Sequence, residues 1–120
     1  MLLVEDNPDV AEVARLLLEE LGYDVVHAAD VAAAREALAR GSIDVVLTDI
    51  VMPGGANGLD LAREVRQRQS LPVVLVTGYS DQAQAAANEG FVILRKPYIM
   101  SGLHDVLREA LDAGATAKVA

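Results

Sequence analysis

The chain has 120 residues, a formal charge of −8 and no cysteine, which allows one domain with a real core and excludes disulfides and thiolate metal sites. The acidic balance argues against nucleic-acid binding by this domain, because contacts to phosphates need clustered Lys and Arg. No apolar stretch reaches the length of a membrane span and no basic segment follows Met1, so we expect a cytoplasmic protein without membrane contact.

Short apolar runs alternate with longer segments of helical period along the chain. The expected strands are 2–4, 24–27, 43–48, 73–76 and 91–94. The expected helices begin at Asn7-Pro8, Val31, the segment before Leu61, Asp81 and the segment before Leu103. This alternation predicts an α/β fold with a parallel sheet covered on both faces. The common arrangement for such a set is the flavodoxin-like (βα)5 three-layer sandwich, with a five-stranded sheet of order 2-1-3-4-5.

The first and last segments have distinct patterns. The first helix is expected to bury one apolar stripe and to end at Gly22. The stripe consists of Val10, Val13, Ala14, Leu17 and Leu21. Three glycines and a proline make 53–58 a loop. Residues 1–113 are predicted to form the domain, and 114–120 a frayed C-terminal tail.

Polar residues follow four of the expected strands. Glu5 and Asp6 follow the first strand, Asp49 closes the third, Thr77 the fourth, and Lys96 follows the fifth. Open α/β sheets place their chemistry at the carboxyl ends of the strands, and strands one and three flank the switch point. The three acids are therefore expected to be neighbours.

These residue types suit phosphoryl transfer. A carboxylate cluster holds a hard divalent cation such as Mg²⁺, and a hydroxyl and an amine hold an anion beside it. A carboxylate is a weak nucleophile, so its attack on a phosphoryl donor needs a cation that neutralises the transferring oxygens. Glu5, Asp6 and Asp49 supply the acids, while Thr77 and Lys96 supply the donors.

At these residues the chain resembles the receiver domain of bacterial two-component response regulators, over essentially its whole length. The motifs that carry the resemblance are Val4-Glu5-Asp6-Asn7, Thr48-Asp49-Ile50-Val51-Met52-Pro53-Gly54, Val76-Thr77-Gly78 and Leu94-Arg95-Lys96-Pro97. The Glu-Asp-Asn-Pro and Leu-Arg-Lys-Pro-Tyr segments look most like receivers of hybrid sensor histidine kinases, with a stand-alone regulator as the alternative.

The resemblance implies a phosphoacceptor signalling domain, not an enzyme. It would take a phosphoryl group from a phosphohistidine of a histidine kinase or of a histidine phosphotransfer protein. Asp49 would be the phosphoacceptor, and Mg²⁺ would be held by Glu5, Asp6, Asp49 and the backbone carbonyl of Val51.

The resemblance also assigns a switch hydroxyl to Thr77, a phosphate-pairing amine to Lys96 and a commonly cis bond to Lys96-Pro97. Ile93 stands where receivers usually carry Phe or Tyr, and the 19 positions from Thr77 to Lys96 are short for the family, which favours a trimmed fourth helix. Because Ile93 is stiff at χ1, we expect Thr77 to move while the fifth strand changes little. Tyr79 would screen the phosphoryl group from water.

Other interpretations stay open. An Asp-nucleophile phosphatase would need a second acid two residues after the nucleophile, where Val51 stands, and a phosphate-independent interaction module would need none of this chemistry. Asp6 could instead cap the first helix. His27 and His104 lack partners at metal-ligand spacing and are interpreted as surface or boundary residues.

Overall fold

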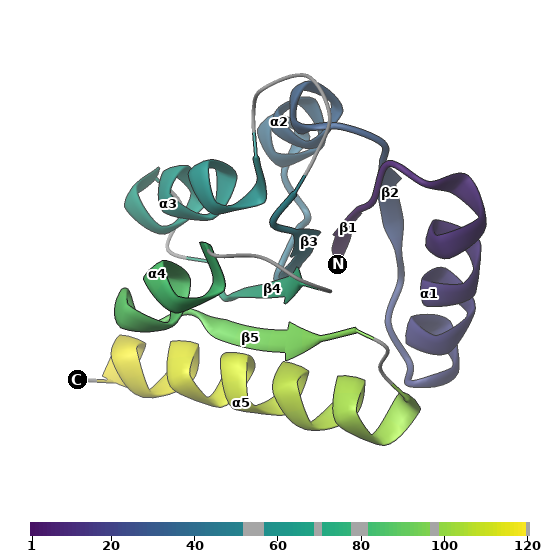
Figure 1. The fold of residues 1–120 in the computed structure, drawn as a ribbon. Helices are drawn as coiled ribbons and strands as arrows, with labels where there is room; N and C mark the ends of the chain where they lie inside the picture. Colours follow the sequence, from purple (N-terminus) through teal and green to yellow (C-terminus); the bar gives the residue numbers. More distant parts are fainter. Residues whose placement is uncertain (52–56, 69–70, 78–81, 97–98, 120) are drawn as a thin grey trace.

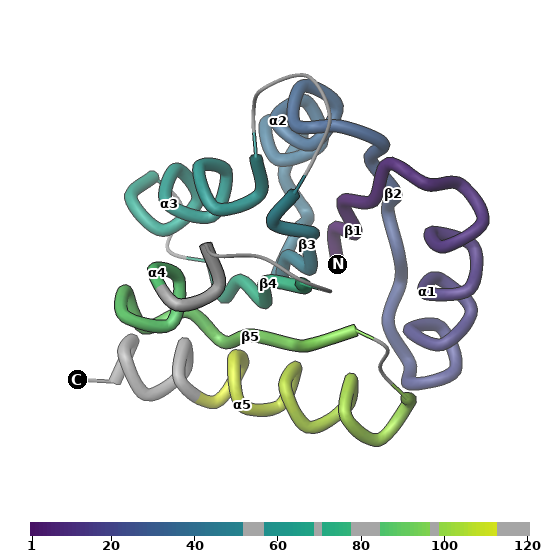
Figure 2. Tube along the Cα trace, in the orientation of Figure 1, coloured from purple at the N-terminus to yellow at the C-terminus, as the bar shows by residue number. Residues whose placement is uncertain are grey.

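A computed structural model describes residues 1–51, 57–68, 71–77, 82–96 and 99–119 of the chain, as the coloured and grey parts of the ribbon indicate (Figure 1). Figure 2 traces the chain in the same orientation and leaves a larger part of it grey, including the end of the last helix. Some expectations fall wholly or partly outside these ranges. They concern the loop 53–58, Tyr79, the helix start at Asp81, the Lys96-Pro97 bond and the last residue of the tail 114–120. Within the described ranges, no helix has the length and apolar character needed to cross a bilayer.

The described strands form one parallel five-stranded sheet of order β2-β1-β3-β4-β5 (Figure 1). The strands are β1 (Leu2–Val4), β2 (Val26–Ala28), β3 (Val46–Asp49), β4 (Val73–Thr77) and β5 (Val92–Arg95). The helices are α1 (Pro8–Glu20), α2 (Val31–Arg40), α3 (Gly58–Arg68), α4 (Gln82–Asn88) and α5 (Met100–Val119). The predicted flavodoxin-like fold and strand order are confirmed.

The sheet separates two aliphatic core clusters. On one face, Leu2, Val46 and Leu75 pack with buried residues of α2, α3 and α4. On the other face, Leu3 and Leu47 pack with residues of α1 and α5. Figure 1 shows the same arrangement, with α1 and α5 on one side of the sheet and the other helices opposite. This alternation follows from the period of two along each strand.

Helix α1 packs on only part of the expected stripe: Ala14, Leu17 and Leu21 contact the core, whereas Val10 and Val13 do not. Its buried residues are Ala11, Ala14 and Leu18, whereas Val13 is 59% exposed and Val10 lies at the exposed boundary. Apolar residues occupy more than one stripe of this helix, so periodicity alone does not select the packed one. The small Ala11 and Ala14 side chains fit the buried stripe, and the branched Val side chains face outward.

Several element ends also differ from expectation. Strands β2, β3, β4 and β5 each end one residue later than the apolar runs, at Ala28, Asp49, Thr77 and Arg95. Helix α5 has the bounds Met100–Val119, and the predicted frayed tail 114–120 stays a prediction. The limit of the domain at residue 113 stays a prediction.

Two arginines of α3 bind the segment that joins α4 to β5. Arg63 pairs with the Glu89 carboxylate at 2.6 Å. Arg66 donates to the Glu89 carbonyl oxygen at 2.7 Å, and its guanidinium lies 3.6 Å from the centroid of the Phe91 ring. A helix as short as α4 has little stability of its own, so these contacts fix its end against α3.

Candidate functional site

Strand register brings the polar strand ends to one edge of the sheet. Asp49 pairs with Val76, and Thr77 pairs with Arg95. The backbone N–H of Lys96 then donates to the Thr77 carbonyl oxygen at 2.9 Å. The carboxyl ends of β3, β4 and β5 are therefore nearly level, and the chemistry-bearing residues leave the sheet together.

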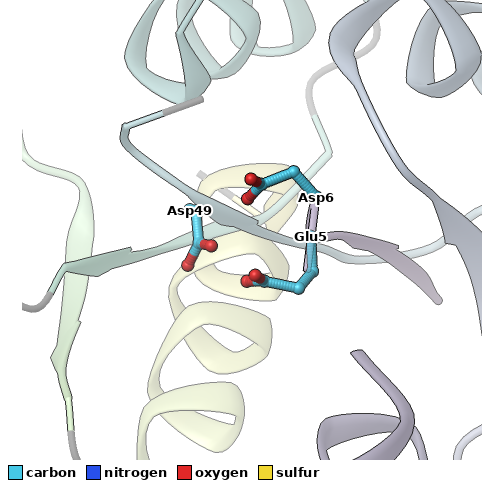
Figure 3. A group of neighbouring side chains, drawn as sticks. All are labelled: Glu5, Asp6 and Asp49. Atoms are coloured by element: carbon cyan, nitrogen blue, oxygen red, sulfur yellow. The ribbon is translucent and has the colours of Figure 1, made fainter. Parts of the chain in front are cut away.

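Three carboxylates converge at this edge (Figure 3). One carboxylate oxygen each of Glu5, Asp6 and Asp49 lie within 4.8 Å of one another. Glu5 and Asp49 are buried, with 5% and 8% of their surface exposed, whereas Asp6 is exposed. The predicted acid cluster is present, with two members inside the protein and one at its surface.

Asn7 determines how the chain leaves β1. Its side-chain oxygen accepts hydrogen bonds at 2.9 and 3.1 Å from two N–H groups in the first turn of α1, which makes Asn7 the N-cap. Its own N–H donates to Glu5 Oε1 at 3.2 Å. The capping role considered for Asp6 is therefore wrong, and the Asp6 carboxylate points toward Asp49 (Figure 3).

Lys96 brings a cation to the acids. Its Nζ lies 3.1 Å from Asp49 Oδ1 and 3.6 Å from Glu5 Oε2. Its side chain is a third exposed, so these ion pairs are partly screened by solvent. One ammonium faces three carboxyl groups, so the ionised cluster remains attractive to a further cation.

The surroundings of Asp49 raise the pKa of its carboxyl group to about 7. Burial is the largest cause because it penalises the charged form, and the Glu5 carboxylate adds a hydrogen bond and charge repulsion. Lys96 acts in the opposite direction. Near neutral pH, Asp49 is thus poised to lose its proton when a cation enters the site.

The donor set fits a hard divalent cation. Three carboxylates at this separation offer oxygen ligands, and the exposed Asp6 leaves the metal position open to water and to a phosphate oxygen. Such an ion would neutralise charge on a transferring phosphoryl group. The burial of Glu5 and Asp49 would strengthen that electrostatic effect.

Two further predicted site residues follow from the strand ends, Thr77 at the end of β4 and Val51 just after β3. Thr77 ends β4 and is 4% exposed, and its hydroxyl has no hydrogen-bond partner among the residues that the structure describes. A buried hydroxyl without a partner costs stability and can accept a new one. Val51 follows β3 by two residues and has an exposed side chain. Their roles stay predictions.

Two residues beside the acids carried no functional sequence signal. Gly58 opens α3, and a Cβ at this position would lie 1.7 Å from the Asp49 carbonyl oxygen. The His27 ring nitrogen lies 2.8 Å from the Glu5 carbonyl oxygen. The sequence pattern indicated only a loop at Gly58 and a surface position for His27. It could not indicate these contacts, because they join different segments of the chain and involve backbone atoms.

The fold and the acidic edge together define a signalling receiver, and comparison with known proteins agrees. Residues 1–108 match the family described as the response regulator receiver domain. The response regulator protein PilR of Pseudomonas aeruginosa is 38% identical over 114 residues, which cover 92% of this chain and 25% of that protein. A response regulator receiver domain protein from Clostridium thermocellum superposes with a TM-score of 0.86 at 28% identity, covering 97% and 96% of the two chains.

The receiver domain of NtrX from Brucella abortus is similar too, with a TM-score of 0.84 and 28% identity over 92% of this chain and 97% of that one. The chain belongs to the response regulator receiver domain family. Receivers of this family are signalling domains that typically interact with histidine kinases. The chain spans about a quarter of the length of PilR.

Proposed function

We propose that this domain accepts a phosphoryl group on Asp49 from a phosphohistidine, with Mg²⁺ held by Glu5, Asp6, Asp49 and the carbonyl of Val51. The observation that carries the proposal is the cluster of three carboxylates with Lys96 against two of them. The donor would be a histidine kinase or a histidine phosphotransfer protein. Attachment to a hybrid kinase stays a prediction, since the relatives reported above are response regulators.

The residues divide the reaction between them. An Asp49 carboxylate oxygen forms a bond to phosphorus, the P–N bond of the phosphohistidine breaks, and the imidazole nitrogen keeps the electron pair. Lys96, 3.1 Å from Asp49 before transfer, would pair with a phosphoryl oxygen afterwards. Thr77 would donate its hydroxyl hydrogen to another oxygen, which would give this buried group a partner. Mg²⁺ would neutralise the charge on the transferring oxygens.

The alternatives lack such support. The position two residues after Asp49 is Val51, which cannot act as the acid that an Asp-nucleophile phosphatase uses. Burying the carboxyl groups of Glu5 and Asp49 side by side costs stability. An interaction module that acts without phosphate would have no use for this costly arrangement.

The test is phosphorylation with phosphoramidate, whose P–N bond resembles that of phosphohistidine, in the presence of Mg²⁺. Intact mass should increase by one phosphoryl group, and hydroxylamine should remove it because an acyl phosphate is a mixed anhydride whose carbonyl carbon hydroxylamine attacks. The Asp49→Asn variant should stay unmodified, while Asp60→Asn, which changes an exposed acid of α3, should react like wild type. Equal labelling of Asp49→Asn would exclude Asp49, and no labelling of wild type would favour the interaction module.

A further inference from the structure

His27 lies on the neighbouring strand β2 and contacts the segment that carries two of the acids. Its ring Nε2 lies 2.8 Å from the backbone oxygen of Glu5. A carbonyl oxygen only accepts hydrogen bonds, so Nε2 must carry the hydrogen and donate it. The contact joins residues 22 positions apart in the chain.

The Glu5 carbonyl needs this donor because the β1–β2 ladder ends there. Glu5 N donates to Ala28 O at 3.0 Å, and β2 ends at Ala28. In a continued parallel ladder, the next N–H toward the Glu5 carbonyl would come from Asp30. Asp30 is instead the N-cap of α2, and the described backbone hydrogen bonds do not include one from Asp30 to Glu5. The His27 side chain donates where the backbone does not.

This carbonyl belongs to the peptide unit that links Glu5 to Asp6. Because a peptide unit is planar, fixing the direction of its C=O also fixes the N and Cα atoms of Asp6. Asn7 N already holds the Glu5 carboxylate at 3.2 Å, and Ala28 O holds Glu5 N. The contact from His27 therefore completes the fixation of the turn from which both carboxylates point toward Asp49 (Figure 3).

We propose that His27 is a positioning residue of the candidate metal site, which acts by holding the Glu5–Asp6 peptide unit through Nε2–H. The inference rests on the proposed function, since it concerns the same Mg²⁺ position. It assigns to His27 no contact with the metal or with the phosphoryl group. Groups that hold metal ligands in place contribute strongly to metal affinity.

The experiment compares three variants with wild type. His27→Ala removes the donor, His27→Gln supplies an amide N–H at a similar distance from the backbone, and His104→Ala is a matched control at an exposed histidine of α5. Amide spectra of the metal-free proteins, titration with Mg²⁺ alone and thermal unfolding are recorded for each. In wild type, ring ¹⁵N shifts of His27 should show the tautomer protonated at Nε2.

His27→Ala should shift the amide signals of Asp6 and Asn7 without metal and weaken Mg²⁺ binding by about tenfold. His27→Gln should restore most of the affinity, and His104→Ala should match wild type. If wild type binds Mg²⁺ and all variants bind it with the same affinity, the role proposed for His27 is overturned, while the proposed function stands. Equal weakening in His27→Ala and His27→Gln would also overturn it. Failure of wild type to bind Mg²⁺ would overturn this inference together with the proposed function.

Discussion

The backbone of Gly58 lies directly against the carbonyl group of Asp49. Gly58 N donates to Ile50 O at 2.7 Å, and a Cβ on Gly58 would lie 1.7 Å from Asp49 O and 2.7 Å from Asp49 C. Such a contact between covalently fixed atoms cannot be relieved by a side-chain rotation. The start of α3 thus sets the position of the backbone that carries the candidate phosphoacceptor.

We expect Gly58→Ala to lower the free energy of unfolding by at least about 2 kcal/mol, because the new methyl group must push the strand end away. Phosphorylation of Asp49 should fall as well. The matched control is Gly102→Ala in α5, where a Cβ meets nothing within 4 Å and where the higher helix propensity should stabilise by about 0.5–1 kcal/mol. Urea unfolding measures both, and wild-type stability of Gly58→Ala would contradict the close contact.

The raised pKa of Asp49 predicts a pH-dependent stability in the absence of metal. The pKa of Asp49 in the folded state, about 7, exceeds the ordinary value of 3.8. At pH values between the two, the folded state therefore holds a proton that the unfolded state has released. Its stabilising contribution is complete below pH 3.8 and is lost as pH rises through 7. Asp49→Asn should therefore be more stable than wild type at pH 8, by about 1–3 kcal/mol. Equal pH profiles of both proteins in urea unfolding would contradict this.

Lys96 should lower the pKa of Asp49 in a measurable way. In Lys96→Met the ammonium 3.1 Å from the carboxylate is lost, so the charged form is less favoured and the pKa should rise above about 7. Lys96→Arg keeps the positive charge and is the control. Carboxyl ¹³C shifts of Asp49 followed against pH would measure the change, and a lower pKa in Lys96→Met would refute the proposed pairing.

Thr77→Val should stabilise the protein in the absence of metal and phosphate. The substitution keeps the shape and replaces a buried hydroxyl that has no partner among the described residues, so we expect a gain of about 1 kcal/mol. Thr77→Ser, which keeps the hydroxyl, should show no such gain. Thermal unfolding checks both variants. A loss of stability in Thr77→Val would mean that the hydroxyl has a partner in solution.

The sequence predicted the fold and the acid cluster because both depend on strong local signals. Apolar runs separated by helical segments are compatible with only a few parallel sheet topologies. Polar residues at the carboxyl ends of the strands meet at one edge of such a sheet, even if the exact strand limits are not known. The one-residue errors at the ends of β2, β3, β4 and β5 did not alter this result.

Other features depend on contacts that no local pattern encodes. The prediction that Val10 and Val13 of α1 are packed was wrong because apolar residues occupy adjacent stripes, and the choice depends on how Ala11 and Ala14 fit the sheet. The roles inferred for His27 and Gly58 depend on carbonyl groups of distant residues. Every residue has a backbone carbonyl group, so the sequence does not indicate which carbonyl groups His27 and Gly58 contact.

The alternation of side chains across the sheet also divides the domain into two compartments. Glu5 and Asp49 continue the alternation of Leu3 and Leu47, whose side chains pack on the α1 and α5 side, whereas Thr77 continues that of Leu75 on the opposite side. A charge that arrives at Asp49 would thus reach the layer of α3 and α4 by two routes, the end of β4 at Thr77 and the contact of Gly58 with the Asp49 backbone. The charge and its transmission to the other face of the sheet rest on different residues, so mutations should alter them separately.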